Sequence, residues 1–166
     1  AEAWRVILED VAGPAVLVLS RQGLPVLHRA SGEYAPVAGV GKGAYVLKDA
    51  EDAQVVLVGT GSEVSTALAA ADLLAADGVR ARVVSMPSWE LFDDQDEEYQ
   101  QSVLPIGVPS VSVEAGISMG WAKWVDASVA IDRFGASAPG NVVMEKYGFS
   151  VENVVSRAFA LLGRKR

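Results

Sequence analysis

The chain has 166 residues, of which 51% are hydrophobic and 21% are charged, and its formal net charge is −7. This composition is typical of a compact folded protein, and its acidity argues against a nucleic-acid partner, because binding to the phosphate backbone needs a basic surface. The absence of cysteine excludes disulfides, thiolate metal sites and cysteine nucleophiles, and it is compatible with a reducing cytoplasm, where we expect the protein. No apolar run is long enough to cross a bilayer, so we expect no membrane partner.

The N-terminal part begins with a short amphipathic pattern. Trp4, Leu8 and Val11 recur at helical spacing, which predicts a helix over residues 3–11. The sequence opens inside this pattern and without a methionine, so we expect it to be a fragment of a longer protein.

A buried strand is predicted next, from the apolar run at residues 15–19. This strand would deliver Ser20 and Arg21 at its carboxyl end, where parallel sheets carry ligand-binding residues. Because its partner strands are not in the sequence, we expect the residues before about 39 to be disordered or paired with a second chain. Residues 23–43 have no periodicity and are rich in glycine, proline and alanine, which indicates a boundary between two domains.

The centre of the chain is predicted to be a strand–turn–helix unit. Residues 55–58 are consecutive apolar residues, as in a strand buried on both faces. A pair of glycines then permits a tight turn, and an alanine-rich helix is predicted over residues 63–77. A right-handed crossover leads to a strand at residues 81–85. The short strand predicted at residues 44–47 has no crossover helix after it and is expected to run antiparallel.

An acidic stretch at residues 90–99 raises two alternatives. Clustered carboxylates could bind a metal ion. The more favoured interpretation is a helix capped by Asp93, with Asp96 and Glu97 facing the positive end of the helix dipole.

The last third of the chain supplies the remaining elements. Strands are predicted at residues 108–114 and 128–131, and a final helix is predicted to begin at the N-cap residue Ser150. Trp121 and Trp124 are interpreted as packing residues. These elements predict an α/β fold, a three-layer α/β/α sandwich around a five-stranded, mainly parallel sheet with one short antiparallel strand.

Thr60, Gly61 and Ser62 form a candidate anion-binding turn, because backbone N–H groups at the start of a helix can hold an anion. The third glycine of a dinucleotide fingerprint is absent, and Glu63 would repel a phosphate. The turn is therefore interpreted mainly as a structural feature, with anion binding as the less favoured alternative.

Arg21 is the candidate that the residues themselves favour most. It follows an apolar run and has no acidic residue beside it in sequence. A guanidinium group in such a place is suited to bidentate contact with a phosphate or carboxylate, and a structural ion pair is an equal alternative. His28, the only histidine, has no partner that would indicate catalysis or metal binding.

Taken together, a series of short motifs resembles the C-terminal end of transketolases over nearly the whole chain. The matching motifs are Leu-Ser-Arg-Gln at 19–22, Gly-Ala-Tyr-Val-Leu at 43–47, Thr-Gly-Ser-Glu at 60–63, Arg-Val-Val-Ser-Met-Pro at 82–87, Phe-Asp at 92–93, Glu-Tyr at 98–99, Ser-Val-Leu-Pro at 102–105, Ser-Val-Glu-Ala at 112–115 and Ile-Asp-Arg-Phe-Gly-Ala-Ser at 131–137.

The resemblance implies a domain organisation and an activity. Residues 1–22 would be the tail of the pyrimidine-binding domain, residues 23–42 a linker and residues 43–166 the transketolase C-terminal domain. Transketolases use thiamine diphosphate and magnesium to transfer a two-carbon ketol unit from a ketose phosphate to an aldose phosphate in the pentose phosphate pathway. The resemblance gives Arg21 the role of binding the sugar phosphate and implies a homodimer for the full enzyme.

The family's diphosphate- and magnesium-binding segment has no counterpart in this sequence. We therefore expect no catalytic residue, no metal ligand and no cofactor in this chain alone, which would need the rest of a transketolase chain as partner to turn over substrate. Two alternatives remain, an independent regulatory module that binds an anion at residues 60–62 and a fragment of the related dihydroxyacetone synthase.

Overall fold

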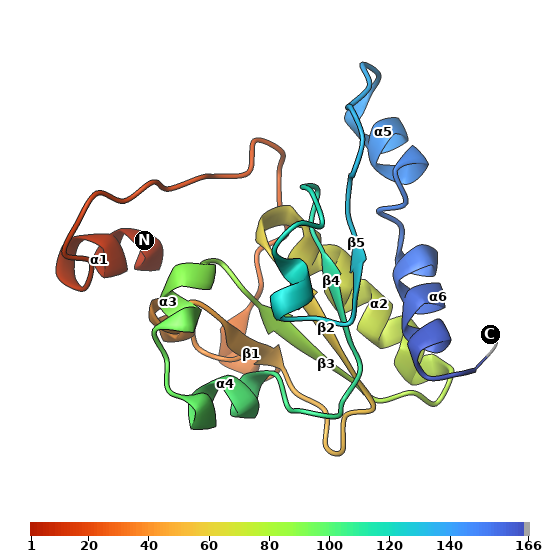
Figure 1. Ribbon diagram of the computed structural model, residues 1–166, viewed down its shortest axis with the longest axis horizontal. Helices are drawn as coiled ribbons and strands as arrows, with labels where there is room; N and C mark the ends of the chain where they lie inside the picture. Colours follow the sequence, from red (N-terminus) through yellow and green to blue (C-terminus); the bar gives the residue numbers. More distant parts are fainter. Residues whose placement is uncertain (165–166) are drawn as a thin grey trace.

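The computed structural model describes residues 1–164 and shows a five-stranded sheet between two layers of helices (Figure 1). The strand order is β1-β3-β2-β4-β5; β1 runs antiparallel to β3, and the other pairs are parallel. This confirms the predicted fold class, including the antiparallel first strand. The strands are β1 (Tyr45–Lys48), β2 (Val55–Gly59), β3 (Ala81–Ser85), β4 (Ser110–Val113) and β5 (Ala127–Val129).

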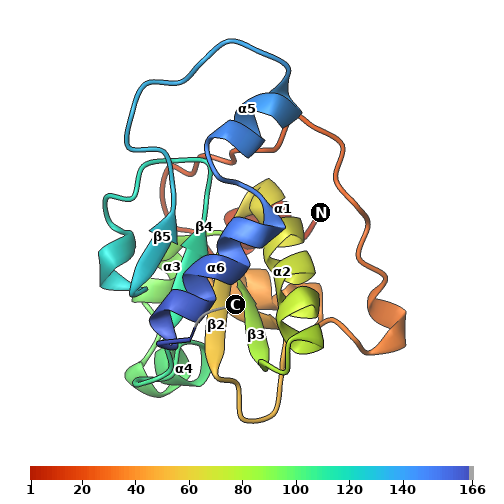
Figure 2. The same ribbon diagram turned by 90° about the vertical axis from the view of Figure 1, so that its right-hand side faces the viewer.

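Six α-helices are present among the described residues, and four of them cover the two faces of the sheet. They are α1 (Glu2–Glu9), α2 (Val64–Ala76), α3 (Trp89–Asp93), α4 (Glu97–Val103), α5 (Gly140–Lys146) and α6 (Val151–Leu161). Helices α2 and α6 lie side by side on one face, as Figure 2 shows, and α3, α4 and a 3₁₀ helix at Trp121–Lys123 cover the other.

Strand β2 lies at the centre because all five of its residues are buried and it pairs with β3 on one side and β4 on the other. Side chains alternate along a strand, so Val55 and Leu57 pack against the layer of α2 and α6, whereas Val56 and Val58 pack against Phe92 and its neighbours. The continuous apolar run thus builds both halves of the core.

The strand predicted at residues 15–19 does not form. The segment is extended and solvated, with Val16 and Val18 exposed to 88% and 86%. No strand lies beside it in residues 1–164, so its backbone has no ladder partner. Figure 1 shows this segment running from α1 to the edge of the sheet at which β2 and β4 end.

The acidic stretch forms two short helices rather than one, and the cap predicted at Asp93 is wrong. The Ser88 side chain accepts a hydrogen bond from Leu91 N and caps α3, whereas Asp96 accepts from Tyr99 N and caps α4. The cap predicted at Ser150 is confirmed by its hydrogen bond from Asn153 N. Within residues 1–164, no helix combines the length and the apolar character that crossing a membrane requires.

Candidate functional site

The region beyond the carboxyl ends of β2 and β4 is the place where this topology would hold a ligand. The chain leaves β2 through α2 on one face and leaves β4 through the 3₁₀ helix at Trp121–Lys123 on the other. Open α/β sheets bind ligands where successive connections diverge in this way. The candidate anion-binding residues Thr60, Gly61 and Ser62 lie there because they directly follow β2.

A carboxylate of the protein itself lies between the ends of these two strands. Glu63 is only 6% exposed; its Oε1 accepts a hydrogen bond from Ser62 Oγ at 2.6 Å and its Oε2 from Ala115 N at 3.3 Å. The Ser65 hydroxyl donates to the carbonyl of Ser62 at 2.7 Å. Two of the donors that an anion would need are therefore satisfied internally, and anion binding at Thr60–Ser62 stays a prediction.

Arg21 lies on the extended segment that passes this edge. Its side chain is exposed and makes no hydrogen bond or ion pair with another described residue. The structural ion pair considered as an alternative is thus not present among residues 1–164. The preceding residue, Ser20, comes close to the β2–α2 turn, since its Oγ lies 3.5 Å from the position that a Cβ on Gly61 would take.

The segment after Arg21 covers a cavity of about 330 Å³. Leu24, Pro25 and Leu27 line it from this segment, and side chains of α2, β1 and the end of β3 line the other side. Arg29 fixes the segment, because its guanidinium donates to the carbonyl of Ala35 and to the hydroxyl of Tyr45. His28 is exposed, and its carbonyl accepts a hydrogen bond from the Ser31 hydroxyl.

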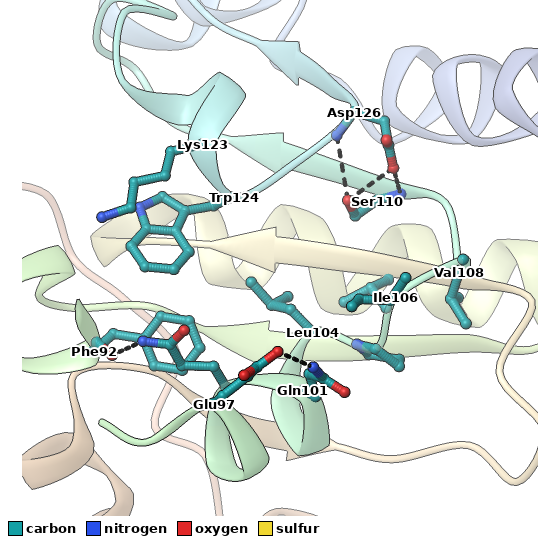
Figure 3. A pocket seen from close by; sticks show the side chains of 14 residues that line it. Phe92, Glu97, Gln101, Leu104, Ile106, Val108, Ser110, Lys123, Trp124 and Asp126 are labelled. Carbon is teal, nitrogen blue, oxygen red and sulfur yellow. Dashed lines mark hydrogen bonds between the residues drawn. The ribbon is translucent and has the colours of Figure 1, made fainter. Parts of the chain in front are cut away.

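A second cavity of about 330 Å³ lies at the opposite, amino-terminal edge of the parallel strands (Figure 3). Trp124, Leu104 and Ile106 contribute apolar lining. Two pairs of polar lining residues are hydrogen-bonded to each other: Ser110 donates to Asp126, and Gln101 donates to Glu97.

The acidic stretch does not assemble a metal site. Asp96 is occupied as a helix cap, and both oxygens of Asp93 lie 2.5 Å from Lys123 Nζ. Across residues 1–164, no group of three or more His, Cys, Asp or Glu side chains is placed to hold a metal ion. The interpretation of this stretch as helix-forming is therefore the better one, apart from the position of its first cap.

Comparison with known families identifies the domain that carries these residues. Residues 43–150 match the model of the transketolase-like C-terminal domain, which is more than half of the chain. The chain belongs to the transketolase family. The family resemblance inferred from the sequence motifs is confirmed.

Individual transketolases match nearly the whole chain. The transketolase of Halalkalibacterium halodurans is 50% identical over 168 residues, which are 98% of this chain and 25% of the relative. The structure of transketolase from Leishmania mexicana superposes with a TM-score of 0.90 at 46% identity, over 98% of this chain and 23% of that one. A split-gene transketolase described as an inactive β4 tetramer is 25% identical, with a TM-score of 0.65 over 88% of this chain and 49% of that one.

The chain thus spans about a quarter of the length of the full transketolases that it matches. The part of the site that sequence reasoning missed is the contact from Glu63 to Ala115. These residues are 52 positions apart, and only their places at the ends of two adjacent parallel strands bring them together.

Proposed function

We propose that this chain serves as the C-terminal quarter of a transketolase, an enzyme that transfers a two-carbon ketol unit from a ketose phosphate to an aldose phosphate. The observation that carries this proposal is the 50% identity to a transketolase over 98% of the chain. In this organisation residues 1–22 belong to the pyrimidine-binding domain, residues 23–42 are the linker and residues 43–166 are the C-terminal domain. We expect the full enzyme to be a cytoplasmic homodimer.

Arg21 is proposed to bind the phosphate of the sugar substrate. Its guanidinium group is solvent-exposed and has no protein partner among the described residues, so its donors are free for an anion. A charge-assisted, bidentate contact of this kind fixes the phosphate end of the sugar. That contact would orient the distant reacting carbonyl, where a misplacement of about 1 Å can cost roughly a hundredfold in rate.

The described residues do not fit the cofactor that the family resemblance implies, thiamine diphosphate with magnesium. They gather no metal-binding group, and the Glu63 carboxylate lies where a diphosphate would approach the start of α2. We therefore assign no residue of this chain to the cofactor. In this proposal the cofactor site is built by the rest of the transketolase chain, and this chain alone is inactive.

The role of Arg21 is tested by its effect on substrate choice in the full enzyme. The variant Arg21→Gln should lower kcat/KM for a phosphorylated ketose by about 10- to 100-fold, because a hydrogen bond to a charged group contributes roughly 1.5–3 kcal/mol. The value for the same ketose without its phosphate should stay within about twofold. An equal loss for both substrates would mean that Arg21 does not bind the phosphate.

A further inference from the structure

The turn between β2 and α2 is closely associated with the segment that carries Arg21. Gly61 has a φ of +54°, in the region where side chains other than glycine are strained, and the nearest atom to a Cβ built on it is Ser20 Oγ at 3.5 Å. A β-branched side chain at position 61 would therefore meet both a strained backbone and the residue that precedes Arg21. A Cβ alone would lie at ordinary van der Waals distance from Ser20, so the conflict comes from the branches beyond it.

This turn is also unusually well fixed for a surface connection. The buried carboxylate of Glu63 accepts hydrogen bonds from the Ser62 hydroxyl and from the backbone amide of Ala115. Ala115 lies two residues past the end of β4. A second hydrogen bond, from Ser65 on α2, fixes the carbonyl of Ser62. The turn is thus held by contacts to α2 and to the end of β4, and it can support the segment that lies beside it.

The other end of the segment is fixed to the same domain. Arg29 donates to the carbonyl of Ala35 and to the hydroxyl of Tyr45, and Ala35 N donates to the carbonyl of Leu47 at 2.9 Å. Residues 21–26 therefore run between two points of contact with the domain, Gly61 at one end and the Arg29 cluster at the other. The first residue of that span is Arg21.

We propose that the β2–α2 turn positions Arg21 for the sugar phosphate, with Gly61 and Glu63 as positioning residues that do not touch the substrate. The inference rests on the proposed function, because it assumes that Arg21 binds phosphate. It gives the Thr-Gly-Ser-Glu motif a role, which is to position a binding residue that lies on the neighbouring segment. In this role the buried carboxylate of Glu63 stabilises the turn and does not act by repelling the substrate phosphate.

The test uses the full enzyme and the ratio of kcat/KM for a ketose phosphate to kcat/KM for the same ketose without phosphate. The variant Gly61→Val should lower this ratio by about tenfold, because a displaced Arg21 loses its aligned contact. Gly78→Val is the matched control: Gly78 has a φ of +76° at the other end of α2, and no atom lies within 4 Å of a Cβ built on it. Gly78→Val introduces a similar backbone strain and should leave the ratio within about twofold of the parent value.

Two further variants keep the test decisive if Gly61→Val fails to fold. Glu63→Ala removes both contacts of the carboxylate and should lower the ratio by about threefold or more. Glu63→Gln can keep them, because its amide oxygen accepts from Ala115 N while its amide nitrogen donates to the Ser62 hydroxyl. Its ratio should return to within about twofold of the parent; a clear rise above the parent would instead mean that Glu63 acts by repelling the phosphate, and it would overturn the positioning role.

Arg21→Gln, measured in the same assay, separates the two proposals. If it lowers the ratio while Gly61→Val and Glu63→Ala leave it unchanged, the positioning role is wrong and the proposed function stands. If Arg21→Gln leaves the ratio unchanged, the proposed role of Arg21 fails and the positioning role fails with it. A loss in all three, with Gly78→Val and Glu63→Gln close to the parent, supports both.

Discussion

The side chain of Glu63 reaches from the start of α2 to the end of β4, where its Oε2 lies 3.3 Å from the backbone nitrogen of Ala115. This contact lies at the edge where α/β sheets of this topology bind ligands. An acidic side chain is rarely buried without compensating hydrogen bonds, and here Ser62 and Ala115 supply them. The Glu63 carboxylate is therefore part of the internal structure of the domain.

Removing the Glu63 carboxylate should destabilise the fold. Glu63→Ala leaves the Ser62 hydroxyl and the Ala115 amide without their partner, and we expect a loss of about 2–3 kcal/mol in the free energy of unfolding. Glu63→Gln should lose less than about 1 kcal/mol, and Glu51→Ala, at an exposed turn position, less than about 0.5 kcal/mol. Urea denaturation of the three variants measures these differences; equal stabilities for Glu63→Ala and Glu51→Ala would contradict the structural role.

Trp121 should be the most sensitive aromatic residue in the layer of α3 and α4. It is 1% exposed, packs edge-on against Trp89 with ring centroids 5.0 Å apart, and donates from Nε1 to Glu114 Oε2. Trp121→Ala should lower the free energy of unfolding by about 3–5 kcal/mol. Trp4→Ala is the matched control, because Trp4 is 56% exposed, and should cost less than about 1 kcal/mol. Thermal melts followed by circular dichroism measure the stability of both variants. A comparable loss in both would contradict this packing.

The loop after β5 should respond to acid through Asp132. Hydrogen bonds from the backbone amide and the hydroxyl of Ser118 hold the pKa of this carboxyl below its ordinary value. Because the pKa is lowered in the folded state, the contact is fully present above the unfolded pKa of about 3.9 and is lost as the pH falls through the folded value.

An NMR titration of the Asp132 carboxyl carbon tests this directly. The midpoint in the folded chain should lie below the midpoint measured for the same residue in urea. A folded midpoint at or above the unfolded one would show that Ser118 does not stabilise the charged form.

The central elements were predictable because local and long-range preferences agree there. The apolar run of β2 is buried on both faces, and β3 has the predicted bounds of residues 81–85. The cap at Ser150 followed from its side-chain chemistry alone. Helix α5 was missed because its apolar residues stand together at 142–144 and do not recur at helical spacing.

The errors arise where the sequence pattern depends on neighbours. The run at residues 15–19 has strand composition, but a strand needs a partner, and none lies beside it among the described residues. Asp93 has a side chain suited to capping, but α3 begins after the N-cap Ser88 and ends at Asp93. The Asp93 side chain instead forms an ion pair with Lys123. Arg21 was predicted as a binding residue from its local sequence, and that role stays a prediction. The proximity of the preceding Ser20 to the β2–α2 turn could not be predicted, because it depends on the path of residues 10–28.

The most direct test of this account is a ketol-transfer assay of the purified chain, alone and together with the remaining three-quarters of a transketolase, in the presence of thiamine diphosphate and magnesium. We predict no turnover by the chain alone and activity only when the cofactor-binding part is supplied. Ketol transfer by the chain alone, in a preparation free of full-length enzyme, would contradict it.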